Sequence, residues 1–372
     1  MRVLIVTTWY PTVTSPVSGI FIRKDAEILA RSHDVRVLHL TSPAHLSDAD
    51  EVADREHRVP VTRVPMSTGS PRQILSAWPR IESMLRDADV LHTHAFSTLL
   101  PFAMHRVPVP WVHSEHWSGI GDPASLTSRG RAVLRVTAPL LRRPDVVTAV
   151  SAYLGDRVRA YRRGLISIVP PAVRAANPVP PPADPSSPAL VSVGGLVEGK
   201  DPFLALATVR ELHRRGVSAR ATWIGGGPLA DALRGEIRGE DAFTLAGPMD
   251  AAGVGAALDA SDIFLLPTRG ETLCLSALEA ITHGRPVVIG DRGGPREYIE
   301  PANGRLVSER TPEAYADAVE DVWRRREEFD PFAVAATIGT RYTPESVLAG
   351  YDRAYADAAA ARSRRGGVTR LE

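Results

Sequence analysis

The sequence predicts an α/β protein with two doubly wound, Rossmann-like domains whose parallel sheets face a central cleft. Short apolar strand patterns alternate with amphipathic helix patterns along the whole chain, which is typical of parallel β–α units. A proline-rich stretch, AVRAANPVPPPADPSSP at 172–188, interrupts this alternation near the middle of the chain. Proline lacks a backbone donor and cannot continue a helix or an inner strand, so we expect this stretch to connect the two domains.

The first half opens with a buried strand, Val3–Thr7, and an amphipathic helix, Ile20–Ala30. The helix side chains expected to face inward are Phe21, Ala26, Ile28 and Leu29. Further apolar runs predict strands at Val35–Leu40, Val61–Val64, Val90–His92, Trp111–His113, Val146–Val150 and Ile166–Val169. Ser151 is a good N-cap for a helix that starts at Ala152.

The second half repeats the alternation. Its strands are predicted at Leu190–Val193, Ala221–Ile224, Phe243–Leu245, Ile263–Leu266, Val287–Ile289 and Leu306–Val307. Helices are predicted at Leu275–Ile281, Pro312–Arg326 and Pro344–Ala360. We therefore expect an N-terminal domain at 1–173, a linker at 174–188, a C-terminal domain at 189–342, and a final helix and tail at 343–372 that pack back towards the N-terminal domain.

Composition excludes several classes of protein. The net charge is +1, which gives no electrostatic reason to expect a nucleic-acid partner. The single cysteine, Cys274, excludes a disulfide framework and a cysteine-based zinc site. No apolar run approaches the ~20 residues of a membrane helix, and MRVLIVTTWYP at the N-terminus lacks the apolar length of a signal peptide. We expect a soluble, cytoplasmic protein; a basic interfacial helix at 129–143 is the less favoured interpretation, because Pro139 and Pro144 cut it short.

Two glutamates and a lysine carry the functional signal. Glu271 follows the strand Ile263–Leu266, where ligands bind in open parallel sheets. Glu279 lies eight positions later, about two helical turns further on and on nearly the same face. The helix N-terminus between them can hold a phosphate, so the layout favours a nucleotide-sugar site. Only two of the 44 basic residues are lysines, Lys24 and Lys200, and Lys200 lies in a glycine-containing loop after a strand.

Several motifs resemble those of the retaining glycosyltransferases of family 4, which have the two-domain GT-B fold. They are WYP and SGIFIR within 9–23, LHTHAF at 91–96, SEHWSG at 114–119, VGGLVEGKDP at 193–202, IGGGP at 224–228, AGPM at 246–249, LPTRGETLCLSALEA at 266–280 and NGRLV at 303–307. The resemblance covers nearly the whole chain. It implies an acceptor-binding N-terminal domain, a donor-binding C-terminal domain, no metal or other cofactor, and a UDP- or GDP-sugar as co-substrate.

The resemblance also implies roles for individual residues. His116, Lys200 and Glu271 are expected at the reaction centre: His116 at the donor sugar, Lys200 at the diphosphate leaving group and Glu271 at the sugar hydroxyls. Glu279 is expected at the ribose, and Gly19 at the diphosphate. The other residues expected to bind the donor are Gly194, Gly195, Gly225, Gly247, Pro248, Met249, Thr272, Leu273, Cys274 and Leu275.

Two positions depart from the family pattern. Gly195 stands where many members carry an arginine that faces the diphosphate, so one fork-shaped donor is missing. Thr272 and Cys274 replace two glycines, which leaves larger side chains at the edge of the sugar pocket. The first departure bears on catalysis and the second on the identity of the donor sugar.

The acceptor and two alternative functions stay open at this point. Trp9, Tyr10, His94 and Trp117 are candidate acceptor contacts on loops of the N-terminal domain, since aromatic faces stack on sugars or other flat molecules. His92, His94 and His113 are otherwise expected to be core or strand-end residues rather than metal ligands. A nucleotide-sugar epimerase of the same fold, or a non-catalytic nucleotide-sugar-binding protein, would share the donor motifs.

Overall fold

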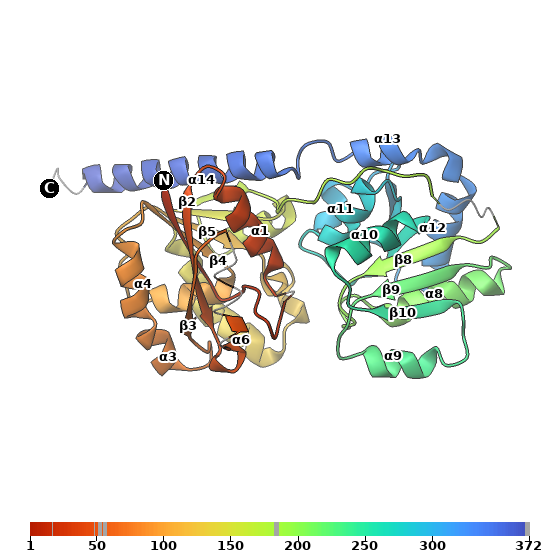
Figure 1. Ribbon diagram of the computed structural model, residues 1–372, viewed down its shortest axis with the longest axis horizontal. Helices are drawn as coiled ribbons and strands as arrows, with labels where there is room; N and C mark the ends of the chain where they lie inside the picture. The colour runs from red at the N-terminus through yellow and green to blue at the C-terminus, as the bar shows by residue number, and fades with distance from the viewer. Residues whose placement is uncertain (17, 48, 51–53, 55–57, 182–185, 369–372) are drawn as a thin grey trace. The chain divides into compact units, whose positions relative to one another are not determined.

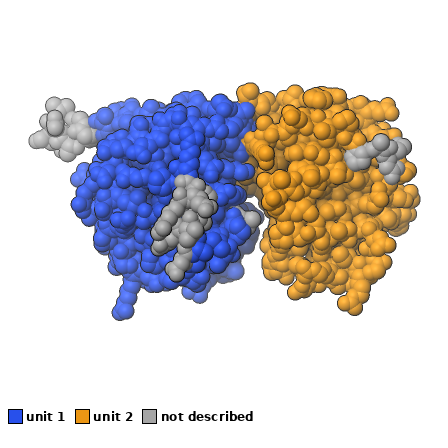
Figure 2. All heavy atoms as spheres, viewed as in Figure 1, with its two compact units in different colours: residues 1–172, 342–372 blue, residues 173–341 orange. Residues whose placement is uncertain are grey.

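The computed structural model describes residues 1–368 except 17, 48, 51–53, 55–57 and 182–185, and it forms two compact units (Figure 1). Unit 1 comprises Met1–Ala172 together with Tyr342–Glu372, and unit 2 comprises Val173–Arg341 (Figure 2). Each unit has one fully parallel sheet covered by helices, so the predicted class of two doubly wound α/β domains is confirmed.

Unit 1 is built on a seven-stranded sheet in the order β3-β2-β1-β4-β5-β6-β7. The strands are β1 (Arg2–Thr7), β2 (Asp34–Thr41), β3 (Val61–Pro65), β4 (Val90–His94), β5 (Trp111–Glu115), β6 (Val146–Ala149) and β7 (Leu165–Ile168). The strand order changes direction between β1 and β4. β1 pairs in parallel with both of its neighbours, β2 and β4, along Val3–Thr7. This reversal is the switch point at which open α/β sheets bind ligands.

The α-helices of unit 1 connect these strands. They are α1 (Ile20–Leu29), α3 (Pro71–Ser76), α4 (Trp78–Leu85), α5 (Ser118–Gly121), α6 (Ser128–Thr137), α7 (Ala152–Arg159) and α14 (Pro344–Val368). Short 3₁₀ segments lie at η1 (Pro43–His45), η2 (Phe96–Phe102), η3 (Pro123–Ser125) and η4 (Ala138–Arg142). Ser151 caps α7 as predicted, because its side chain accepts a hydrogen bond from the Leu154 N–H.

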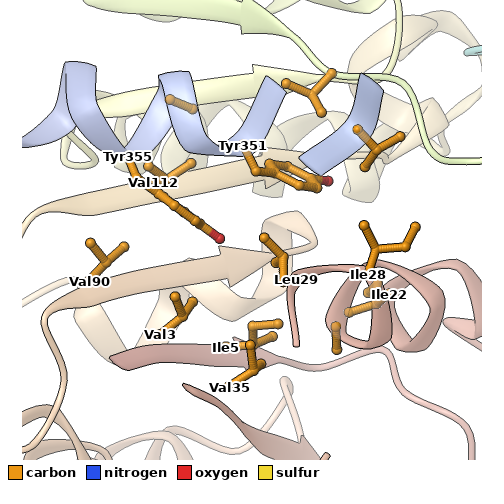
Figure 3. Packing of buried hydrophobic residues seen from close by; sticks show 14 of the residues in the cluster. Val3, Ile5, Ile22, Ile28, Leu29, Val35, Val90, Val112, Tyr351 and Tyr355 are labelled. Carbon is orange, nitrogen blue, oxygen red and sulfur yellow. The ribbon is translucent and has the colours of Figure 1, made fainter. Parts of the chain in front are cut away.

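The helix α14 follows unit 2 in the chain but completes the core of unit 1. Its buried face contributes Val347, Tyr351, Ala354, Tyr355 and Ala358 to a cluster that also contains residues of α1 and of the sheet. Figure 3 shows the rings of Tyr351 and Tyr355 pointing from α14 towards the strands. Each phenol also has a polar partner in this core, because buried hydroxyls require one.

Unit 2 has a six-stranded sheet in the order β10-β9-β8-β11-β12-β13, with its own switch point between β8 and β11. The strands are β8 (Ala189–Val193), β9 (Arg220–Ile224), β10 (Phe243–Gly247), β11 (Ile263–Leu266), β12 (Val287–Gly290) and β13 (Gly304–Val307). The helices are α8 (Pro202–Arg214), α9 (Ala230–Glu236), α10 (Ala251–Asp259), α11 (Leu275–Thr282), α12 (Pro312–Arg324) and α13 (Pro331–Ala336), with 3₁₀ segments η5 (Gly294–Glu297) and η6 (Arg326–Glu328).

Phe21, which was expected to face the core, is partly buried: it packs against the core cluster and contacts the rings of Trp9 and His116, while Ile22 and the carboxylate of Asp25 are fully buried. The described start of the proline-rich segment, 173–181, groups with unit 2. It is held there in part by the buried guanidinium of Arg285, which donates to the Val179 carbonyl at 2.9 Å.

Asp25 should make the stability of unit 1 fall as pH rises. Burial raises the pKa of Asp25 from 3.8 to about 7, although the Tyr351 hydroxyl donates to Oδ2 at 2.8 Å. Oδ1 has no partner within the described chain. The folded protein therefore binds a proton between about pH 4 and 7 that the unfolded chain releases, and stability is lost as pH rises through this window. Asp25→Asn keeps the shape without the titration.

The measurement is the melting temperature of the wild type and of Asp25→Asn between pH 4 and 8. We expect the melting temperature of the wild type to fall by several degrees relative to the variant as pH rises from about 4 to 7. Parallel curves would show that Asp25 does not titrate in this range.

Candidate functional site

The switch point of unit 2 brings Lys200 and Glu271 together. Lys200 follows β8 and Glu271 follows β11, and these neighbouring strands end at the same edge of the sheet. The Lys200 Nζ lies 2.5 Å from Glu271 Oε1. The Thr268 hydroxyl lies 2.9 Å from the same Oε1 and 2.9 Å from the Gly199 carbonyl, so it joins the two loops. Sequence reasoning missed Thr268, whose position three residues before Glu271 was the available signal.

The ion pair fixes the charge of Lys200. Burial alone lowers the pKa of Lys200, but the adjacent Glu271 carboxylate outweighs burial, and the pKa is raised above its ordinary value. The ammonium is therefore charged at neutral pH. About a quarter of the Lys200 side chain is exposed, against 11% for Glu271, so the pair is accessible from solvent on the lysine side. A charged, accessible lysine at a switch point can neutralise a phosphate.

The first turn of α11 supplies backbone donors next to this pair. Its N-cap residue, Cys274, has φ 72 and makes no side-chain cap, which leaves the N–H groups of the first turn for another acceptor. The Tyr298 hydroxyl donates to the Leu273 carbonyl at 2.7 Å and holds the turn in place. Burial raises the pKa of the Cys274 thiol to about 11, so the thiol adds no negative charge here. The start of α11 is thus suited to bind an anion.

The glycines of the loops mainly serve contacts between loops. A Cβ at Gly293 would lie 2.0 Å from the Glu271 carbonyl, and one at Gly294 would lie 2.2 Å from the Thr272 carbonyl. Likewise a Cβ at Gly225 would lie 2.0 Å from the Gly194 carbonyl. At these positions glycine lets two loops pack against each other, a pairing that a single sequence does not show.

Other predicted donor residues surround the same edge. A Cβ at position 195 would have nothing closer than the Gly226 carbonyl at 3.6 Å, an ordinary van der Waals distance, so a side chain could start there without a clash. Gly247, with φ 74, accepts a hydrogen bond from the Gly225 N–H at 2.9 Å, and Pro248 packs over Gly226. Further along the edge, Met249 is exposed. Thr272 and Leu275 flank the N-cap of α11, and Glu279 lies half-buried on its second turn.

In unit 1, His116 follows β5 and is positioned by a buried carboxylate. Glu115 Oε1 accepts hydrogen bonds from the N–H groups of His116 and Trp117, each at 2.8 Å. Glu115 Oε2 lies 3.3 Å from His113 Nε2, and the side chains of both residues are fully buried. Burial, with a contribution from His113, lowers the pKa of His116 to about 3, so its imidazole is neutral at physiological pH. Sequence reasoning missed Glu115, although its place between His113 and His116 was a usable signal.

His116 belongs to a buried network of polar side chains that extends to Tyr355 on α14. Its Nε2 lies 3.2 Å from His94 Nδ1, and the rings of His94 and His92 are in tilted contact, with 4.0 Å between their centroids. His92 is 2.8 Å from the Tyr355 hydroxyl and 2.7 Å from the Ser114 hydroxyl. His92, His94 and His113 are all fully buried, as expected for core histidines. His94 therefore supports His116 from within the core, and its proposed acceptor contact does not fit this burial.

The other site residues predicted in unit 1 are Gly19, Trp9, Tyr10 and Trp117. Gly19 is the N-cap of α1 with φ 65, and a Cβ there would lie 2.5 Å from the Trp9 backbone, so geometry alone requires glycine. Trp9 and Tyr10 line a cavity. Trp117 instead stacks on Phe96 at 5.6 Å and does not line that cavity.

The described residues contain no group of three or more His, Cys, Asp or Glu side chains placed to hold a metal ion. Among the same residues, no helix combines the length and apolar character needed to cross a bilayer.

Comparisons with known sequences find glycosyltransferases. The family profile described as "Glycosyl transferases group 1" matches residues 187–325, and that described as "Glycosyltransferase Family 4" matches residues 26–177. A GDP-mannose-dependent alpha-mannosyltransferase of Mycolicibacterium smegmatis is 27% identical over 326 residues, covering 82% of this chain and 84% of that protein. A glycogen synthase of Mycobacterium tuberculosis is 27% identical over 331 residues, 80% of each chain.

Solved structures share the fold at low sequence identity. HepE of Anabaena, in complex with UDP and glucose, superposes with a TM-score of 0.75 at 16% identity, covering 95% of this chain and 98% of that one. Sucrose-phosphate synthase from Thermosynechococcus elongatus gives a TM-score of 0.71 at 17% identity, covering 100% and 99%. These likenesses establish the architecture of the two units.

The packing of Gly293 against the Glu271 loop makes a stability prediction. Gly293→Ala places a side chain at φ +90 and a Cβ 2.0 Å from the Glu271 carbonyl oxygen. We therefore expect the free energy of unfolding to fall by about 1–3 kcal/mol. Gly270→Ala is the control, because a Cβ there meets no atom within 4 Å. Thermal melting of both variants is the measurement; equal melting temperatures would contradict the assigned packing.

Proposed function

Because the chain belongs to the group 1 and family 4 glycosyltransferases, which transfer a sugar from a nucleotide-sugar donor, we propose that unit 2 binds this donor and unit 1 binds the acceptor. The observation that carries the proposal is the Lys200–Glu271 pair beside the N-terminus of α11. It combines a cation and backbone donors for a diphosphate with a carboxylate for sugar hydroxyls. The sequence relatives support a GDP-sugar as the donor, since one is named GDP-mannose-dependent. The resemblance to the family also allows a UDP-sugar.

The proposed chemistry is a metal-independent transfer with retention of configuration. When the bond between the anomeric carbon and the diphosphate breaks, negative charge develops on the leaving phosphate oxygen. Lys200 and the first N–H groups of α11 stabilise this charge, which is usually the largest catalytic contribution in such a site. Glu271 holds hydroxyls of the donor sugar, and Glu279 holds the ribose hydroxyls. The leaving oxygen takes the proton of the acceptor hydroxyl as the new glycosidic bond forms on the same face.

The proposed role of His116 uses its neutral form. A neutral imidazole can hydrogen-bond a hydroxyl of the donor sugar without adding a charge that would oppose the positive charge developing at the anomeric carbon. Glu115 fixes the backbone of His116, and His94 restrains its ring. Gly195 leaves Lys200 without the second cation found in many relatives, so Lys200 carries more of the leaving-group charge in this chain.

Substitution of Lys200 tests the proposal. Lys200→Ala should lower the turnover of GDP- or UDP-sugars about 100-fold or more, because the charge that Lys200 opposes grows in the transition state. Affinity for free GDP or UDP, measured by calorimetry, should fall much less. Lys24→Ala, the other lysine, is the matched control on α1. Equal losses in the two variants, or no loss in either, would remove Lys200 from the reaction centre.

Substitution of His116 separates catalysis from structure. His116→Ala should reduce kcat strongly while the affinity for free GDP or UDP stays within about threefold, since His116 is assigned to the sugar end of the donor. The low pKa of His116 further implies that its titration contributes no inflection to kcat between pH 5 and 8. The melting temperature is recorded on the same preparation. A large loss of stability with normal activity per folded molecule would make His116 a structural residue.

A further inference from the structure

Unit 1 contains a cavity of about 480 Å³ at the carboxyl ends of β1, β2 and β3, a volume typical of small-molecule sites. Nine of the sixteen residues that line it are serine or threonine. They include Thr12 and Ser15 after β1, Thr41 and Ser42 at the end of β2, and Ser67 and Thr68 after β3. Each hydroxyl both donates and accepts hydrogen bonds, which matches the hydroxyl groups of a polyol. Trp9 adds an aromatic surface on which the C–H face of a sugar ring can pack.

The lining carries no formal charge. Among the described residues that form the cavity wall there is no Asp, Glu, Lys or Arg. Of its two histidines, His45 is exposed and His39 is almost fully buried. Burial, together with the nearby Arg63 guanidinium, lowers the pKa of His39 to about 3, so His39 is neutral at physiological pH.

The charged residues behind the cavity wall do not favour the binding of an anion in the cavity either. Arg63 donates from Nε and Nη2 to the two oxygens of Asp54, at 2.7 and 2.8 Å. Its Nη1 donates to His39 Nδ1 at 2.7 Å, and its Nη2 also donates to the Pro11 carbonyl at 2.9 Å. Asp50 lies 3.9 Å from Arg63 and adds a second carboxylate. With two carboxylates around one guanidinium, this group has a net charge of −1, and the guanidinium is already committed to its partners.

The cavity adjoins the residues assigned to the reaction. The Thr8 hydroxyl, in the cavity wall, lies 2.5 Å from the Ser97 hydroxyl, and the Thr8 N–H donates to Thr98 Oγ1 at 2.9 Å. Thr98 in turn donates to the carbonyl of His94, which bonds His116. One strand, β4, separates β1 from β5 in the sheet. A molecule in the cavity can therefore extend towards His116 along the switch point of unit 1.

We propose that this cavity holds the acceptor, and that the acceptor is an uncharged polyhydroxylated molecule, a sugar unit or a cyclic polyol, rather than a phosphorylated one. The inference rests on the proposed division of donor and acceptor between the units. It goes further by naming the chemistry of the acceptor. Neutral hydroxyl groups find many partners in the wall, whereas a phosphate would find no free cation there and would face the net negative charge behind it.

Binding in the absence of nucleotide tests this directly. The full chain is titrated, with saturation-transfer NMR as the readout, with methyl α-D-mannopyranoside and with myo-inositol, and with mannose 6-phosphate and myo-inositol 1-phosphate as their charged counterparts. We expect at least one neutral compound to bind about tenfold or more tightly than its phosphate. The mannoside and inositol arms distinguish a sugar unit from a cyclic polyol. Tighter binding of the phosphates, or no binding of either neutral compound at millimolar concentration, would overturn the inference.

Variants then locate the site. Ser67→Ala should weaken binding of the neutral compound several-fold, and Ser67→Lys should shift the preference towards the phosphate by adding a cation to the wall. Ser76→Ala is the control, because Ser76 is exposed on α3 and outside the cavity. Unchanged preference in Ser67→Lys, with normal melting temperature, would place the acceptor elsewhere.

The same preparations keep the two proposals separate. GDP and UDP binding is measured alongside, and it depends on unit 2. Normal nucleotide binding and donor turnover with a preference for phosphorylated acceptors would reject the acceptor inference alone. Absence of any donor use would reject the proposed division of roles, while the binding data would still decide the chemistry of the cavity.

Discussion

The packing of α14 onto the sheet of unit 1 is the interaction on which the rest of that unit depends. Tyr351 and Tyr355 fill the space between α1 and the strands, and each also meets a buried polar group: Asp25 for Tyr351, and His92 for Tyr355. The ring of His92 contacts the ring of His94, which is hydrogen-bonded to His116. The helix therefore does more than cover apolar surface. It completes a hydrogen-bonded network whose far end is the residue assigned to the donor sugar, so the stability of the domain and the geometry of its site share the same contacts.

In unit 2, backbone contacts between loops hold the candidate site residues in position. Its loops are locked to one another at positions where only glycine fits, and this rigid edge presents Lys200, Glu271 and the start of α11 together. The ion pair gives this edge a charged and partly exposed group. The cavity of unit 1 differs in charge, because its lining consists mainly of neutral hydroxyl groups. The charged residues behind the lining, such as Arg63 and Asp54, are paired with one another. One unit is thus suited to a charged leaving group and the other to an uncharged nucleophile.

Much of this architecture could be predicted from the sequence. All thirteen strands among the described residues were expected, with bounds that differ by at most two residues, because buried parallel strands are short apolar runs between clear breakers. Lys200 and Glu271 were each placed in a loop that follows a strand, but their ion pair depends on the strand order, which brings β8 and β11 side by side. The burial of Asp25 could not be recognised, because it depends on Tyr351, a partner supplied by α14. The glycine contacts between loops and the proposed acceptor cavity could not be predicted for the same reason: each is formed by segments whose pairing local sequence patterns do not encode.

The insertion of unit 2 before α14 has a consequence for how the chain folds during translation. Domains usually fold in order as they leave the ribosome, but the sheet of unit 1 must wait for a helix that is made after the whole of 173–341. At 5–20 residues per second this delay is roughly 10–30 s. Unit 2 has its full set of strands and helices before unit 1 does. During the wait, the face of the nascent sheet that Tyr351 and Tyr355 later cover is open to water and to chaperones, which makes it the surface most prone to aggregation during synthesis.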